Sequence, residues 1–157
     1  MINIGLISLD IIIIAVIIFV LVLLCLKNKK HYVTALIVSI YPTILIYKNF
    51  PFIDFTNKTA EVIFLIIIYF AILFILKRNI SSGGNYYSNY LSKILNGVIL
   101  SVTFVFLLLS VYVHSLPELG NIYNFSSQTT ALVANIPIGL SLIIPIVIIL
   151  FLNKRDN

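Results

Sequence analysis

Residues 6–26 read LISLDIIIIAVIIFVLVLLCL, and Asp10 is the one charged residue in this run. About 20 consecutive apolar residues in a helix cross the hydrocarbon core of a bilayer, which is about 30 Å thick. A basic turn follows directly, with Lys27, Lys29 and Lys30, in place of a small-residue cleavage site. We therefore expect a retained membrane-spanning helix and not a signal peptide.

The composition of the whole chain agrees with this first run. Of the 157 residues, 61% are hydrophobic and only 10% are charged, and the mean hydropathy is +1.16. An ordinary globular domain has about 45–50% apolar and about 25% charged residues. This chain has too little charge to cover a surface in water, so a soluble domain is excluded and lipid is the expected solvent.

Four further apolar runs of suitable length follow the first, each bounded by charged or turn residues. We predict a single membrane domain over residues 1–157, all-α, built as a bundle of five transmembrane helices. The loops between them are short, so neighbouring helices should be antiparallel. The predicted spans are residues 6–26, 32–47, 60–76, 94–113 and 131–152.

The basic residues are concentrated on one side of the predicted spans. Ten Lys and Arg stand against five Asp and Glu, for a net charge of +5. Eight of the ten fall on one side of the spans and two, Lys48 and Lys58, on the other. The positive-inside rule then places the N-terminus outside and the C-terminus in the cytoplasm. The basic excess thus predicts an orientation and gives no reason to expect a nucleic acid partner. The eight are Lys27, Lys29, Lys30, Lys77, Arg78, Lys93, Lys154 and Arg155.

Asp10 is the candidate functional charge, because an ionisable group inside a span is costly and marks a functional site by default. On the predicted topology it lies near the outer face, at about the depth of His114 and Glu61. An Asp10–His114 contact would form a proton relay or gating pair. In the alternative interpretation, all three groups sit at the interface and reach water or helix-end amides.

Small residues at spacings of four predict close helix packing. They occur as Ala35, Ser39 and Thr43 in the second span, and as pairs in the fourth and fifth. We expect these three spans to form the packed centre and the uniformly apolar span 60–76 to face lipid. The same region offers an alternative, in which Asn96, Ser101, Thr103 and Asn135 line a polar path. The two pairs are Gly97 with Ser101 and Asn135 with Gly139.

Prolines interrupt two of the predicted spans. Pro42 lies in the second, and Pro137 and Pro145 lie in the fifth. Each removes a backbone hydrogen bond, so we expect kinks at these positions. A re-entrant hairpin bent at Pro137 and Pro145 is the alternative to a fifth span.

The sequence contains no pattern typical of catalysis or of metal binding. Its one Cys, two His and five carboxylates show no metal-ligand spacing and no nucleophile beside a base. Gly83-Gly84 lacks the Lys and Ser or Thr of a phosphate loop and reads as a linker. We expect no enzyme activity, no cofactor and no metal.

The N-terminal block resembles that of the colicin V production protein family, in which an Asp stands just ahead of a long apolar helix and a basic turn. Residues 90–97, YLSKILNG, are similar to the family's amphipathic stretch before a glycine-bearing span. The resemblance covers about residues 6–114. This chain differs from the family pattern in three ways. Its turn at 27–30 has no glycine, its later span keeps only Gly97, and it has a fifth predicted span where the family usually has four.

The resemblance implies a bacterial inner-membrane protein associated with export, envelope maintenance or biofilm phenotypes, and carries over only Asp10 as a functional residue. We therefore expect a non-enzymatic membrane protein that acts through self-association or a membrane partner. The main alternative is an oligomeric channel or transporter subunit for a small solute. A holin-like lytic protein is a third possibility.

Overall fold

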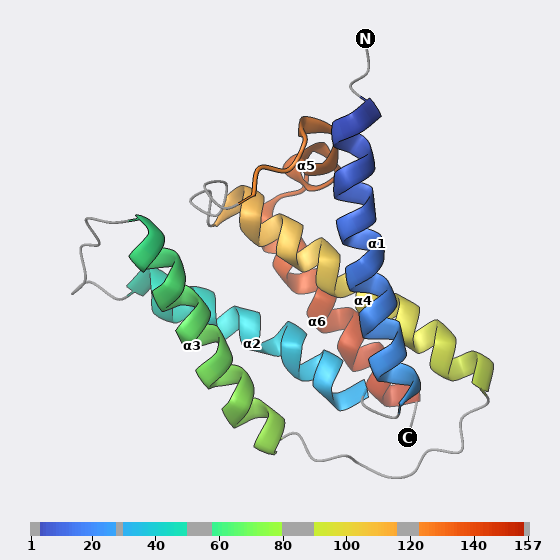
Figure 1. Ribbon diagram of the computed structural model, residues 1–157. Helices are drawn as coiled ribbons and strands as arrows, with labels where there is room; N and C mark the ends of the chain where they lie inside the picture. The colour runs from blue at the N-terminus through green and yellow to red at the C-terminus, as the bar shows by residue number, and fades with distance from the viewer. Residues whose placement is uncertain (1–3, 28–29, 50–57, 80–89, 116–122, 156–157) are drawn as a thin grey trace.

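The computed structural model describes residues 4–27, 30–49, 58–79, 90–115 and 123–155. Throughout these ranges the secondary structure is helical, with no β-strand, which confirms the all-α class (Figure 1). The helices are α1 (Ile4–Leu26), α2 (Lys30–Asn49), α3 (Lys58–Asn79), α4 (Tyr90–His114), α5 (Ser127–Ala134) and α6 (Ile138–Arg155).

The first four predicted spans each correspond to one helix that extends a few residues further at one or both ends. Three helices are long and apolar enough to cross a membrane, and a fourth crossing is possible if α5 and α6 count as one broken span. These helices fit a multi-pass membrane protein. The three qualifying segments are Leu9–Leu26 in α1, Thr59–Arg78 in α3 and Leu91–His114 in α4.

The fifth predicted span, residues 131–152, is not one kinked helix. α5 ends at Ala134, α6 begins at Ile138, and the two are bent by 81°. Pro137 has no N–H to donate and disfavours helical backbone at Ile136, which favours the break at this position. Pro42 and Pro145, in contrast, remain inside α2 and α6.

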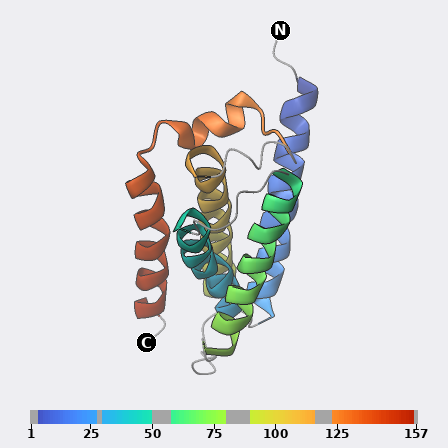
Figure 2. The same cartoon turned by 90° about the vertical axis from the view of Figure 1, so that its left-hand side faces the viewer.

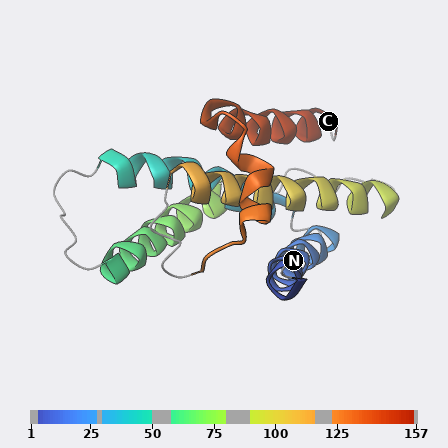
Figure 3. The ribbon, with the colours of Figure 1, turned by 90° about the horizontal axis from the view of Figure 1, so that it is seen from above.

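α4 is the central helix of the bundle. α1, α2, α5 and α6 all pack against it, whereas α3 packs on α2. Seen from the side and from above, α5 lies across one end of the bundle and over α4 (Figures 2 and 3). α2 and α6 thus pack on α4 as predicted, whereas α1, which the prediction left out of the centre, packs on α4 more extensively than either.

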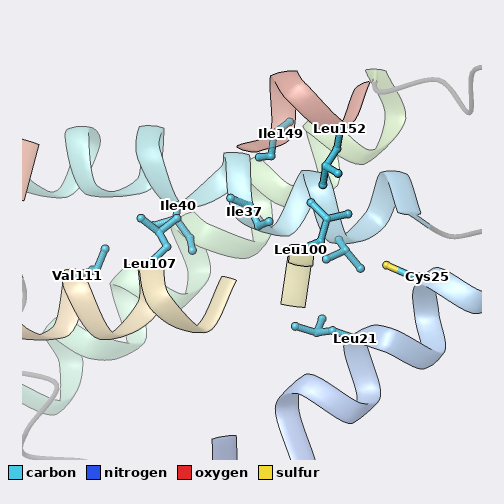
Figure 4. Close-up of a cluster of buried hydrophobic side chains, with 10 residues drawn as sticks. Leu21, Cys25, Ile37, Ile40, Leu100, Leu107, Val111, Ile149 and Leu152 are labelled. Atoms are coloured by element: carbon cyan, nitrogen blue, oxygen red, sulfur yellow. The ribbon is translucent and has the colours of Figure 1, made fainter. Parts of the chain in front are cut away.

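The main core cluster joins four helices (Figure 4). Leu100 and Leu107 of α4 are fully buried at its middle. Around them pack Leu21 and Cys25 of α1, Val33, Ile37 and Ile40 of α2, and Ile149 and Leu152 of α6.

Gly97 lies at a close approach between α4 and α1. A Cβ added to Gly97 would lie 3.1 Å from Cβ of Cys25, closer than side-chain packing normally allows. Ser101, one turn further on, is fully buried. The Gly97–Ser101 pair thus packs helices closely, as predicted.

The second predicted pair has no such role in the described chain. Nothing lies within 4 Å of a Cβ built at Gly139, and Asn135 is exposed. Asn135 instead terminates α5, where its backbone N–H bonds to the carbonyl of Val133. The helix break places the pair at an exposed bend, and a spacing of four residues brings groups together only within a continuous helix.

α3 lies at the edge of the bundle, as its uniform apolar sequence predicts. Only 6% of its apolar segment is buried, against 56% for α4. It is joined to α2 at both ends. Tyr47 of α2 donates a hydrogen bond to Glu61 at one end, and at the other the Lys77 ammonium lies 4.7 Å from the centre of the Tyr32 ring.

Candidate functional site

Asp10 of α1 is buried, with 2% of its surface exposed. Both carboxylate oxygens accept hydrogen bonds from the segment around the start of α5. The Tyr123 hydroxyl donates to Oδ1 at 2.5 Å. The Ser126 backbone N–H and the Thr129 hydroxyl donate to Oδ2 at 2.9 and 2.7 Å. Three donors thus satisfy a carboxylate that would otherwise be costly to bury.

The local sequence explains why a helix begins at this carboxylate. Ser126 is the N-cap of α5, with extended backbone angles, and its Oγ accepts from the Thr129 N–H at 3.3 Å. This capping bond satisfies one of the amides that every helix start leaves unpaired. Asp10 adds a negative charge at the positive end of the helix dipole, which stabilises α5 further.

His114, at the end of α4, contacts the opposite end of α5. Its Nε2 lies 3.3 Å from the carbonyl oxygen of Val133, in the last turn of that helix. With Nε2 protonated the ring donates to this carbonyl, and a cationic ring would also suit the negative end of the dipole. α5 is therefore held at its start by α1 and at its end by α4. We call Asp10, His114, Tyr123, Ser126 and Thr129 the α5 clamp.

The two residues that the sequence singled out act on the same helix without meeting. In the described part of the chain no hydrogen bond joins Asp10 to His114, because each is bonded to α5. The direct pair is thus replaced by a connection through α5. Asp10 does reach a helix-end amide, that of Ser126, as the alternative interpretation expected. Glu61 bonds instead to Tyr47 of α2.

Sequence reasoning missed Tyr123, Ser126 and Thr129, which lie in a segment that reads as polar and mobile. One local signal was present, because Ser is a preferred N-cap residue and Ser126 stands a few residues ahead of the apolar residues Ala131 and Leu132. Nothing local indicates that these residues meet Asp10, more than a hundred positions away.

Aromatic packing fixes the segment that leads into α5. Phe125 lies between two tyrosines, with ring centroids 5.2 Å from Tyr112 of α4 and 4.8 Å from Tyr123, both edge to face. The Tyr112 hydroxyl also donates to Oδ1 of Asn124 at 3.2 Å. These contacts tie Tyr123 to α4 and aim its hydroxyl at Asp10.

The Asp10 carboxylate changes the chemistry of Tyr123 in turn. Donating its hydrogen bond to Asp10 raises the pKa of Tyr123 to about 12, since ionisation would lose that bond and set two negative charges side by side. The phenol therefore stays protonated, and remains a donor, at any physiological pH.

The polar residues inside α4 are bonded mainly to their own helix. The Ser101 hydroxyl donates to the Gly97 carbonyl and that of Thr103 to the Ile99 carbonyl, both at 2.7 Å. Because these hydroxyls donate to carbonyls of their own helix, they are not available as donors to other groups. Asn96 differs, because its Oδ1 is buried and has no hydrogen-bond partner in the described structure. The polar path predicted from Asn96, Ser101, Thr103 and Asn135 remains a prediction.

Among the described residues, no group of three or more His, Cys, Asp or Glu is placed to hold a metal ion. Comparison with protein families, with curated proteins and with solved structures finds no match to this chain.

Proposed function

We propose that the protein is a five-span bacterial inner-membrane protein with its N-terminus outside and its C-terminus in the cytoplasm. The apolar lengths of α1, α3 and α4 support a multi-pass chain. In this topology α2 is also a span, α6 is the fifth, and α5 lies at the outer surface. The eight Lys and Arg then share the cytoplasmic side.

Within that membrane it acts as a non-enzymatic protein of the colicin V production type, in envelope or export processes. It works through self-association or through a membrane partner. The α5 clamp is the observation that carries this proposal. In the clamp, a buried carboxylate holds a short surface helix in a fixed position. A surface that is already ordered binds a partner with a smaller loss of conformational entropy.

The free side of α5 supplies a contact surface. Leu132 is 69% exposed, and Ser127, Gln128 and Ala131 are exposed beside it. A large apolar side chain with small and polar neighbours, on a helix that is already ordered, binds a partner with little further loss of conformational entropy.

Energy transfer between labelled copies in vesicles tests the self-association form. We expect transfer above the random level, reduced by Leu132→Gln at the α5 surface. Phe74→Gln is the matched control, because Phe74 is 69% exposed on α3, away from α5. Random transfer in the unmodified chain would exclude self-association. If the protein instead acts through a membrane partner, Leu132→Gln should abolish its envelope or export function in its own cells, and Phe74→Gln should not.

A channel or transporter subunit is the second candidate, and Asn96 is the observation that favours it. A buried oxygen without a hydrogen-bond partner is rare and is often functional. In an oligomer, the polar faces of α2, α4 and α6 would surround a path. Solute-specific flux into liposomes that is abolished by Ser101→Leu or Asn135→Leu would support the channel, and unchanged permeability would exclude it.

A further inference from the structure

The end of the bundle opposite α5 gathers basic residues from several helices. Lys27 directly follows α1 and Lys30 begins α2. Lys77 and Arg78 lie in the last turn of α3, and Lys93 lies in the first turn of α4. We call these five residues the basic rim. α6 also ends here, with Lys154 and Arg155 in its last residues.

Three contacts fix these helix ends at one level. Lys77 lies over the ring of Tyr32, which joins the end of α3 to the start of α2. Gly97 abuts Cys25, which joins the start of α4 to the end of α1. Leu152 packs in the core cluster with residues of α1, α2 and α4 (Figure 4), which brings the end of α6 to the same level.

The charge at this end is predominantly positive. Among the side chains that the structure describes, the carboxylates are Asp10 and Glu61, and both lie toward the other end of the bundle, bonded to Tyr123 and Tyr47. In the sequence, the eight basic residues assigned to this side and the one acid Asp156 leave it with a net charge of +7. Positive charges gathered at one end of the bundle repel one another and favour bound anions.

The way α3 is attached makes that repulsion consequential. Lys77 and Arg78 sit on a helix that packs chiefly on α2, whereas Lys27 and Lys93 belong to the α1–α4 pair. Several anions bound along this end would offset the repulsion and help to link the α2–α3 pair to the rest of the bundle.

We propose that the basic rim binds the phosphates of anionic phospholipids and that these lipids brace α3 against the bundle. Headgroup phosphates lie at the depth where the membrane helices end, and Tyr32 beside Lys77 is suited to that depth. Clusters of four to eight Lys and Arg next to a span are typical of anionic lipid binding. The proposal requires a bilayer, but it does not depend on the proposed function or on the orientation.

Thermal unfolding of the full chain in a neutral detergent, followed by circular dichroism, tests the proposal. Phosphatidylglycerol should raise Tm, and phosphatidylcholine with the same acyl chains should not. The variant Lys77→Gln with Arg78→Gln should lose most of this difference. Lys48→Gln, which removes an exposed lysine at the far end of α2, is the matched control and should keep it.

Each contrary outcome is decisive. Equal shifts with the two lipids, or equal loss of the shift in the Lys48→Gln control, would overturn the proposal. A Tm shift of the same size with inorganic phosphate alone would show that the basic rim binds a free anion, and would overturn the proposal that it binds lipid.

A second measurement needs no variant and so stands even if the double variant fails to fold. Spin-labelled phosphatidylglycerol should show a larger immobilised fraction beside the unmodified chain than spin-labelled phosphatidylcholine. About 1 kcal/mol for each basic residue near an anionic surface corresponds to about a fivefold preference per contact. Equal immobilised fractions would refute lipid selectivity.

Discussion

The two ends of the bundle handle polar groups in opposite ways. At the α5 end, the buried carboxylate of Asp10 is matched by three donors from the chain itself. At the other end, Lys and Arg from four helices gather beside a tightly packed apolar core. One end is therefore stabilised by specific internal hydrogen bonds, whereas the other combines apolar packing with an excess of positive charge.

Removing the carboxylate should have the largest effect on this contrast. Asp10→Ala leaves the Tyr123 hydroxyl, the Ser126 N–H and the Thr129 hydroxyl without their acceptor. We expect a loss of about 3 kcal/mol in the free energy of unfolding, measured with denaturing detergent in mixed micelles. Asp10→Asn keeps one acceptor oxygen and should lose less. Equal, small losses in both variants would mean that the clamp does not hold α5.

Overpacking the other end should have the next largest effect. At position 97 a Cβ alone would lie 3.1 Å from the Cys25 Cβ. The larger side chain of Gly97→Leu should therefore destabilise the fold by about 2 kcal/mol in the same assay. Gly139→Leu is the control, because its surroundings are open, and it should leave stability nearly unchanged. If the two variants behave alike, α1 and α4 are not in close contact at Gly97.

Tyr123→Phe removes one of the three donors to Asp10 and should destabilise less than Asp10→Ala. It also gives a pH test. The pKa of Tyr123 is raised from 10.0 to about 12 in the folded chain, so its stabilising effect is complete below pH 10 and is lost as the pH rises to 12. Stability measured across this range should fall more in the unmodified chain than in Tyr123→Phe. Parallel curves would show that the bond to Asp10 contributes nothing.

Asn96→Leu should have the smallest effect, and of opposite sign. The substitution removes a buried oxygen without a hydrogen-bond partner, so we expect no loss of stability or a gain of up to about 1 kcal/mol. A clear destabilisation in the unfolding assay would indicate that Asn96 makes a bond that the single chain does not contain, such as one to a second copy.

The helices of this protein were predictable because each is a local property of the sequence. Residues 6–26 form α1 because an apolar run of that length has few alternatives in lipid, and the helix found is Ile4–Leu26. Pro137 marked the break between α5 and α6, but the 81° angle depends on how α5 packs across α4. A proline shows where a helix stops and leaves the new direction open.

The α5 clamp was predictable only in part. Asp10 and His114 stood out because titratable groups are rare and costly near a span. Their partners could not be identified, because Thr129 and Val133 are ordinary residues whose importance comes from contacts across most of the chain. Hydropathy and spacing describe neighbours along one helix, and they carry no information about which helices meet.

The contact between Gly97 and Cys25 has a practical consequence for chemical labelling. Cys25 is the single cysteine of the chain, and it is 5% exposed where α4 covers it. Because buried thiols react slowly with alkylating reagents, an introduced cysteine will be the accessible one without removal of the native residue. The variants Lys48→Cys and Lys77→Cys would then report the orientation of the protein. Only the cysteine on the treated side should react with a membrane-impermeant maleimide.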